Sequence, residues 1–380
     1  MAARPAHRCA ADALLVLSLA GGASAPRRLL LERCGGAGAA LAAGPAAWRA
    51  AGLSEAQAQA LREPDPAALD AARAWLAQPR HHLLGCHDPD YPALLRRIAA
   101  PPLALYVDGD PAALWHPALA VVGSRAPSAG GRDNAYRFAR ALAEAGMAVV
   151  SGMAAGVDAA AHEAALARGG LTVAVVGTGA DLAYPRQHAA LRARIAERGA
   201  VVSEHPPGTG ARPSHFPARN RIIAGLALGT LVVEAAERSG ALITARLAAE
   251  AGREVFALPG SIHNPLARGC HRLIRDGAGL VESAEEVLAG VAPLAAELAD
   301  ALRGRLNAPT HRSAEMVGAA PPPSDPDYQR LWQALGHDPT PMDSLIERTG
   351  LTPAALSSML LLMELDGKVA VERGRYTRKP

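Results

Sequence analysis

The sequence predicts an α/β protein whose central part is a Rossmann-like, doubly wound parallel sheet. Six apolar runs recur between residues 118 and 260, and stretches of helical periodicity separate them. Strands that are apolar throughout are typical of a parallel sheet with helices packed on both faces. A chain of 380 residues has room for roughly two or three domains, so we expect smaller domains to flank the sheet.

The composition indicates a protein of the reducing cytoplasm without strong overall charge. The net charge of +3 is too small to indicate a nucleic-acid partner by itself, so only local clusters of arginine can do so. Four cysteines are scattered without a CxxC pair, which argues against structural zinc and against a disulfide framework. They are Cys9, Cys34, Cys86 and Cys270.

The first residues resemble a signal peptide, with Arg4 and Arg8 before an apolar stretch that ends near Ala20. Asp12 interrupts that stretch, however, and the leucines that follow it suit a short buried helix. We therefore expect no cleaved leader. No segment is long enough to span a bilayer, so we also expect no membrane insertion.

Two regions precede the sheet. Residues 1–75 contain short helical stretches broken by glycine and predict a SAM-like or helix-hairpin-helix-like domain. Such a module either binds nucleic-acid backbone through its glycine hairpins or serves as a small packing domain. Residues 76–117 are rich in proline and predict a connector, in which the strand-like segment 103–109 could add to the sheet.

The Rossmann-like domain is expected over 118–290 and is followed by a Pro/Ala-rich linker over 291–324. Residues 325–380 predict three helices and a hairpin, the pattern of a winged-helix domain. The third of these helices, 353–365, has no lysine or arginine and would read a DNA groove poorly. A contact with a protein partner or a second copy is therefore favoured there, and Arg373 and Arg375 of the hairpin are the only hint of nucleic acid.

Residues that follow the strands indicate a site for a phosphate-rich ligand. In doubly wound sheets the ligand lies beyond the carboxyl ends of the strands. Small residues occupy several of these turns, and Arg125 supplies a charge at one of them. The segment 201–260 adds further arginines, the aromatic ring of Phe216, and a Ser-Gly turn before a helix, whose backbone N–H groups attract anions.

Several familiar chemistries are missing from the sequence. There is no GxxxxGK[ST] phosphate loop, and the glycines at 177 and 179 lack the third glycine of a dinucleotide site. No HExxH motif occurs, and the serines have no evident base partner. Asp158 and His162 are interpreted as a helix N-cap and a packed side chain. We expect no cofactor, no metal and no catalytic residues.

Seven motifs, taken together, resemble the DprA (Smf) family of DNA-processing proteins in the order in which that family has them. They cover roughly residues 80–290: GSRAPS, SGMAAGVDAAAHEAAL, GTGADLAYP, SEHPPG, FPARNRIIAGL, VVEAAERSGALITARLAAEAGREVFALPG and GCHRLIRDGA. The resemblance implies a cytoplasmic homodimer that binds single-stranded DNA entering during natural transformation. It also implies that the protein protects that DNA and loads the RecA recombinase onto it.

The resemblance further implies that a basic pocket holds the strand. By motif match and local sequence, the expected DNA-binding residues are Gly123, Ser124, Arg125, Gly152, Arg212, Phe216, Arg219, Asn220, Arg221, Ser239 and Gly240. One departure concerns the position before the Phe-Pro pair, where members often carry a basic or amide residue. This chain has Pro213-Ser214-His215 there, so some phosphate affinity at that position is either missing or supplied by Arg212.

Two other classes of function remain open. Nucleoside-monophosphate phosphoribohydrolases use a similar sheet, and Glu234 with Arg219 could be arranged as in those enzymes, although the PGGxGTxxE turn is missing here. The third class is a scaffold that binds proteins through its flanking domains and has no functional pocket.

Overall fold

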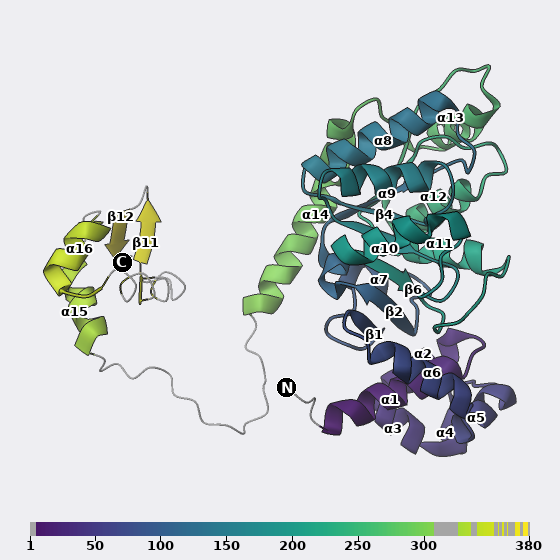
Figure 1. The fold of residues 1–380 in the computed structure, drawn as a ribbon, viewed down its shortest axis with the longest axis horizontal. Coiled ribbons are helices and arrows are strands. Elements are labelled where there is room, and N and C mark those ends of the chain that lie inside the picture. Colours follow the sequence, from purple (N-terminus) through teal and green to yellow (C-terminus); the bar gives the residue numbers. More distant parts are fainter. Residues whose placement is uncertain are drawn as a thin grey trace. The chain divides into compact units, whose positions relative to one another are not determined.

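The computed structural model describes residues 5–307, 326–335, 340–352, 356, 359–360, 363, 369–372 and 375–378. Contacts divide the chain into two compact units, residues 1–306 and residues 307–380 (Figure 1). The larger unit contains a sheet of nine strands in the order β1-β2-β6-β5-β4-β3-β7-β8-β9. These strands are β1 His81–Gly85, β2 Ala104–Gly109, β3 Ala118–Val122, β4 Ala148–Ser151, β5 Thr172–Val175, β6 Ala200–Ser203, β7 Gly229–Val232, β8 Glu254–Ala257 and β9 Gly279–Leu280.

Strands β3 to β9 are parallel, and helices cover both faces of the sheet. Successive residues of β3 point to opposite faces. Leu119 and Val121 share a hydrophobic cluster with α8, α9 and α14, whereas Ala120 and Val122 share one with α11 and α12. The helices around the sheet are α7 Ala93–Arg96, α8 Ala129–Glu144, α9 Val157–Ala167, α10 Ala189–Arg198, α11 His215–Leu226, α12 Gly240–Glu250, α13 Arg268–Arg275 and α14 Ala284–Asn307, with short 3-10 turns η1 Pro111–Trp115, η2 Arg186–His188 and η3 Pro265–Ala267. The doubly wound architecture predicted from the apolar runs is confirmed.

The predicted connector is part of the sheet. Strands β1 and β2 form an antiparallel pair, and β2 is antiparallel to β6 at the edge of the parallel strands. All six residues of β2 are buried. The prolines predicted a connector because they lie in the turns at the ends of these short strands. The apolar residues within the strands nevertheless extend the hydrophobic core.

Six helices precede β1 and share a hydrophobic core with the sheet. Leu14, Leu17 and Trp48 are buried in the same cluster as Leu105 of β2. The leucines after Asp12 thus form the buried helix that the sequence predicts. The helices are α1 Pro5–Leu19, α2 Ser24–Cys34, α3 Ala37–Ala42, α4 Gly44–Ala50, α5 Glu55–Arg62 and α6 Pro66–Leu76. The described segments contain no helix with both the length and the apolarity that a bilayer crossing requires.

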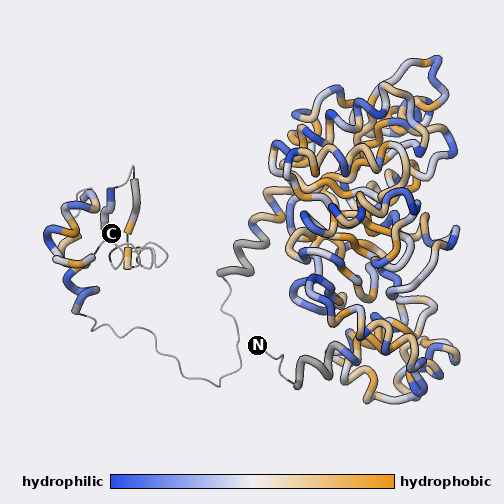
Figure 2. The backbone as a smooth tube through the Cα atoms, in the orientation of Figure 1, coloured by the Kyte–Doolittle hydropathy of each residue, from blue (hydrophilic) through white to orange (hydrophobic). Residues whose placement is uncertain are grey.

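The segment predicted as a linker from residue 291 begins as a helix. Helix α14 continues to Asn307 and contains Pro293. Its Ala, Leu and Glu residues favour helix strongly, and Val291 and Leu298 pack against the sheet. Residues 308–324 of the predicted linker lie outside the described residues. Figure 2 shows orange, apolar segments through the interior of the larger unit and blue segments around its periphery.

The smaller unit has the elements expected of a winged-helix domain. Its described elements are α15 Pro326–Ala334, β10 Thr340–Pro341, α16 Met342–Thr349, β11 Val369–Glu372 and β12 Arg375–Arg378. Strands β11 and β12 form an antiparallel hairpin, and β10 pairs with β12. Most of the predicted third helix, 353–365, and Arg373 lie outside the described residues. Leu331, Leu345 and Val369 belong to the hydrophobic core of this unit.

Candidate nucleic-acid interface

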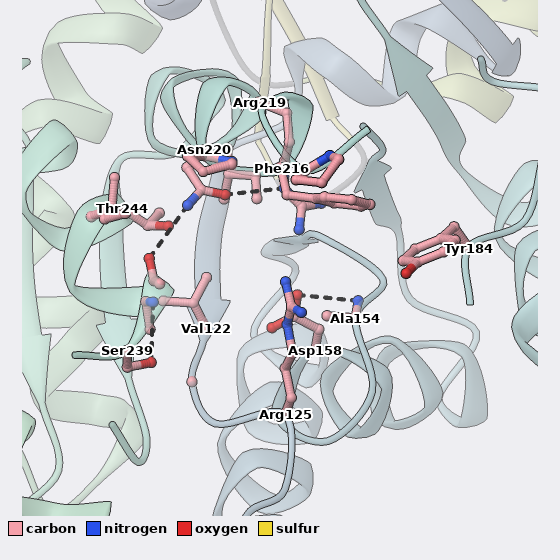
Figure 3. Close-up of a pocket in the computed structure, with 17 residues that line it drawn as sticks. Val122, Arg125, Ala154, Asp158, Tyr184, Phe216, Arg219, Asn220, Ser239 and Thr244 are labelled. Atoms are coloured by element: carbon pink, nitrogen blue, oxygen red, sulfur yellow. Dashed lines mark hydrogen bonds between the residues drawn. The ribbon is translucent and has the colours of Figure 1, made fainter. Parts of the chain in front are cut away.

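A cavity of about 530 Å³ opens where the strand order of the sheet reverses. Strand β3 has β4 on one side and β7 on the other, so the chain builds outward from β3 in one direction and later in the opposite direction. Helices on opposite faces diverge at such a point and leave a crevice beyond the carboxyl ends of the strands. We call it the switch-point cavity. The loop after β3 and the first turns of α11 and α12 form its walls (Figure 3).

One face of helix α11 lines this cavity. Phe216, Arg219, Asn220 and Ile223 follow the spacing i, i+3, i+4 and i+7, which places them on the same side of a helix. Arg221 does not belong to this series and does not line the cavity. The helical period therefore places Arg219 toward the cavity and Arg221 away from it.

The rim of the cavity carries one cation and two aromatic rings. Arg125 is exposed, and its guanidinium carbon lies 5.9 Å from the centre of the Phe216 ring. This distance is within the range of a cation–π contact. The Phe216 ring lies 5.0 Å from the ring of Tyr184, tilted by 37°, and Tyr184 is 47% exposed. We call these three side chains the rim.

The floor of the cavity contains a buried arginine, Arg219, which is only 5% exposed. It donates to the carbonyl of Gly152 after β4 at 2.6 Å, to the carbonyl of Val175 in β5, and to Oδ1 of Asn220 at 3.0 Å. Desolvation lowers the pKa of Arg219 to about 10, although the nearby charge of Asp158 acts in the opposite direction. Arg219 therefore joins α11 to the ends of two strands and remains a cation at neutral pH.

Asp158 lies beside Arg219 and completes the floor. Its carboxylate accepts hydrogen bonds from the backbone N–H groups of Gly152 and Ala154, at 3.1 and 3.3 Å. Burial raises the pKa of Asp158, and the Arg219 charge opposes that shift. The prediction of an N-cap role was wrong, because the N-cap of α9 is Gly156 and Asp158 instead stabilises the turn that precedes the helix.

His162, one turn further along α9, is fully buried, as predicted. The Thr172 hydroxyl donates to the carbonyl of Val149, so the Nδ1–H of His162 donates to Thr172 Oγ1 at 2.7 Å. Burial lowers the pKa of His162 to about 3. Its role is therefore to pack as a neutral side chain.

Helix α12 presents its N-terminus to the cavity. The Ser239 hydroxyl caps the helix by accepting from the N–H of Ala241 at 3.3 Å. Asn220 Nδ2 donates to the carbonyl of Gly240 at 3.3 Å and so ties α11 to this turn. A Cβ atom on Gly240 would meet no other atom within 4 Å, so the space beside this backbone is open. Backbone N–H groups at such a helix start favour an anion.

Two glycines near the cavity serve close packing. A Cβ on Gly152 would lie 2.2 Å from the guanidinium nitrogens of Arg219. A Cβ on Gly123 would lie 2.7 Å from Val157 and 2.9 Å from the carbonyl oxygen of Glu234. Gly123 also lines the cavity, whereas Gly152 lies behind Arg219. Ser124 is part of the same turn and accepts a hydrogen bond from the N–H of Ala126 at 3.1 Å.

Two predicted arginines lie away from this cavity. Arg221 forms a two-pronged ion pair with Glu204, with both N–O distances at 2.6 Å. Arg212 is exposed and lines a different cavity, beside the N-terminal helices. The structure thus brings seven of the eleven predicted site residues to one cavity and leaves out Ser124, Gly152, Arg212 and Arg221.

Comparison with known proteins identifies the family. The family model for DNA recombination-mediator protein A matches residues 82–292, and the DprA winged helix domain matches residues 317–375. The chain belongs to the DprA (Smf) family. This result confirms the resemblance carried by the seven motifs, and with it the Rossmann-like and winged-helix assignments.

Relatives extend this likeness over most of the chain. Protein Smf of Escherichia coli is 42% identical over 328 residues, which cover 86% of this chain and 85% of that protein. DNA processing protein DprA of Streptococcus pneumoniae is 48% identical over 202 residues, which cover 53% of this chain and 71% of that protein.

Two solved structures of family members resemble this one. An X-ray structure of DprA from S. pneumoniae has a TM-score of 0.66 and 39% identity, and covers 72% of this chain and 95% of that one. DprA from Helicobacter pylori, whose structure is described for its single-stranded DNA binding mode, has a TM-score of 0.50 and 27% identity over 56% of this chain and 99% of that one.

Sequence reasoning missed Tyr184 as a site residue. It lies in the GTGADLAYP motif, nine residues after β5 ends, and the chain returns there to place its ring beside Phe216. An aromatic residue in the segment that follows a parallel strand was the feature that could have indicated Tyr184 as a site residue. The distance along the chain between Tyr184 and Phe216 concealed their contact.

Proposed function

We propose that this chain binds single-stranded DNA in the switch-point cavity, without strong sequence preference. The contact of Arg125 with Phe216 at an open rim is the observation that carries the proposal. A guanidinium can pair with a backbone phosphate while a partly exposed ring stacks on a base, and every base offers a face for stacking. The start of α12 adds backbone N–H groups on the opposite wall.

The half-buried position of the Phe216 ring favours single strands over duplexes. A base must leave its stack to reach Phe216, and a flexible strand can do so at small cost. In a duplex the same movement requires breaking a base pair. Arg219 and Asn220, the polar side chains that α11 turns to the cavity, already donate to groups of the protein, so phosphates and base faces supply the contacts.

The test is fluorescence anisotropy with labelled single-stranded and double-stranded DNA of one sequence over a salt series. We expect tighter binding of the single strand and a log–log salt slope of roughly −0.7 per phosphate contact. Equal or tighter binding of the duplex would contradict the proposal.

We also propose that the chain loads RecA onto this DNA, acts as a homodimer in the cytoplasm, and protects incoming strands during natural transformation. Membership of a DNA recombination-mediator family supports these finer assignments. The rate at which RecA binds single-stranded DNA, measured with and without the chain, tests the loading activity. Sedimentation analysis tests the dimer, and nuclease digestion of bound strands tests protection.

The alternative of nucleotide hydrolysis has little support. The Glu234 carboxylate accepts hydrogen bonds from the N–H and hydroxyl of Ser128, at 2.8 and 2.5 Å, and from Asn264 at 3.1 Å. It is 8% exposed and is not part of the lining of the switch-point cavity. We infer that the chain has no hydrolase activity, and incubation with AMP followed by chromatography for free adenine tests this inference.

A further inference from the structure

A second cavity, of about 380 Å³, lies between the N-terminal helices and the segment that joins β6 to α11. One wall consists of the turn between α1 and α2, with Gly21, Gly22 and Arg27. The other wall includes Arg212 and the two histidines described below. We call it the junction cavity. Both walls belong to the larger unit of the molecule.

The junction cavity carries uncompensated positive charge. Arg27 is 5% exposed and donates to the carbonyls of Leu17, Ser18 and Gly22 at 2.7, 3.1 and 3.0 Å. Its Nε has no partner among the described residues. Arg212 is exposed and has no ion-pair partner in the part of the chain that the structure describes.

A single acidic side chain, Glu204, belongs to the described lining of this cavity. Both of its oxygens are held by Arg221 at 2.6 Å, so its charge is already neutralised. The cavity therefore has two guanidinium groups, those of Arg27 and Arg212, without a carboxylate of their own. A polyanion would restore the balance.

The junction cavity also offers hydrogen-bond donors. Gly21 and Gly22 both have φ of +66°, and their turn leads into α2, whose first residue, Ser24, lines the cavity. The N-cap residue Ala23 provides no side-chain hydrogen bond, so the first N–H groups of this 11-residue helix have no side-chain cap.

Two histidines complete the opposite wall. The rings of His205 and His215 stack at 3.9 Å with an interplanar angle of 15°. His215 Nδ1 is bonded to the carbonyl of Gly177 at 3.0 Å, which fixes its ring. His205 Nε2 is buried and has no partner among the described residues. Like the Nε of Arg27, it is a buried polar atom that a ligand could satisfy.

The two cavities share one segment of chain. Pro213 and Phe216 line the switch-point cavity, whereas Arg212 and His215 line the junction cavity. Four side chains of this five-residue segment are thus divided equally between two neighbouring cavities. A strand that stacks a base on Phe216 needs to cross only this segment to bring its next phosphates to Arg212.

We propose that the junction cavity is a second site for backbone phosphates of the same DNA strand, with Arg212, His205 and the start of α2 as its contacts. This inference rests on the proposed function and extends it to a longer binding track. Arg212 supplies the exposed charge of this second site, next to Pro213 of the first cavity.

The test compares Arg212→Ala with the unaltered chain on short and long oligo-dT, of about 4 and about 16 nucleotides, which bracket the site sizes of single-strand binders. Arg212→Ala should weaken binding of the long oligomer roughly three- to tenfold, the value of about one ordinary hydrogen bond at an exposed site. It should leave the short oligomer unchanged. The salt slope for the long oligomer should become shallower by roughly 0.7.

Arg198→Ala is the matched control, since Arg198 is an exposed arginine that lines neither cavity. It should alter neither affinity. His205→Phe keeps an aromatic ring for the stack with His215 but removes Nε2, and should also weaken only the long oligomer.

Three results would overturn the inference. Arg212→Ala could bind the long oligomer as tightly as the unaltered chain does, or it could lose equal affinity for the short and long oligomers. Arg198→Ala could also lose as much affinity as Arg212→Ala. These outcomes differ from failure of the proposed function. That failure would appear as absent single-strand binding by the unaltered chain, or as full binding of the short oligomer by Phe216→Ala.

Discussion

The rim and the floor of the switch-point cavity use similar residues for different purposes. On the rim, Arg125 is exposed and its guanidinium carbon lies 5.9 Å from the centre of the Phe216 ring. On the floor, Arg219 is 5% exposed and donates to two backbone carbonyls and one side chain. The guanidinium of Arg125 therefore has N–H donors available for a ligand. The N–H donors of Arg219 instead form the hydrogen bonds that hold α11 to the sheet.

This difference separates the expected effects of mutation. Loss of a buried, hydrogen-bonded cation leaves carbonyls without donors and Asp158 without its neighbouring charge, so it should destabilise the fold. Loss of an exposed cation leaves the fold unchanged within about 0.5 kcal/mol and should affect binding alone.

The largest effect is expected for Arg219→Met. The side chain keeps its approximate length but loses every hydrogen bond, and the free energy of unfolding should fall by about 3 to 5 kcal/mol. Urea denaturation followed by circular dichroism measures this loss. Normal stability with abolished DNA binding would instead place Arg219 among the ligand contacts.

A smaller effect, on binding, is expected for Phe216→Ala. Removal of the stacking face should weaken single-stranded DNA by about 1 to 3 kcal/mol. Anisotropy with oligo-dT measures the change, and Phe216→Tyr is the matched control because it keeps the ring. If both variants bound as tightly as the unaltered chain, the rim would not be the base-stacking site.

Acid should destabilise the fold through His162, which burial keeps neutral. Its pKa is about 3 in the folded chain and about 6.5 when unfolded. The unfolded state therefore binds more protons between these values, and stability falls as the pH is lowered through that window. The expected loss is about 1.4 kcal/mol per pH unit well below pH 6.5.

Urea denaturation between pH 7 and pH 5 measures this slope, and His162→Gln should make it shallower. Some slope should persist in that variant, because burial also lowers the pKa of His205, to about 4. An identical slope in the variant and the unaltered chain would show that His162 is not the group responsible.

The smallest effect is expected for Arg125→Ala. Loss of one phosphate contact should cost about 1 kcal/mol at low salt and reduce the salt slope by roughly 0.7. The loss should be the same for every DNA sequence, which anisotropy with oligo-dT and a mixed sequence can check. A loss confined to one sequence would mean that Arg125 reads a base.

Much of this organisation could be predicted from the sequence. The apolar runs from 118 to 260 predicted strands β3 to β8, and the residues after them predicted the edge of the sheet at which the switch-point cavity lies. The edge strands β1 and β2 were harder to find, because prolines surround them and the pairing of β2 with β6 spans about a hundred residues. The continuation of α14 to Asn307 was missed because proline and alanine composition was interpreted as a linker, although the helix packs on the sheet.

The sequence by itself determined strands β3 to β8, the family and the face of α11 that meets the cavity. Residues i, i+3, i+4 and i+7 share a side of a helix, while Arg221 is turned about 200° from Arg219 at about 100° per residue. Only the tertiary structure decided how deeply each side chain on that face is buried. The carbonyl ends of β4 and β5 meet Arg219 from distant parts of the chain, and Tyr184 reaches Phe216 in the same way. The helical period determines which side of α11 a residue faces. How deeply its side chain is buried depends on the segments, distant in sequence, that pack against that side.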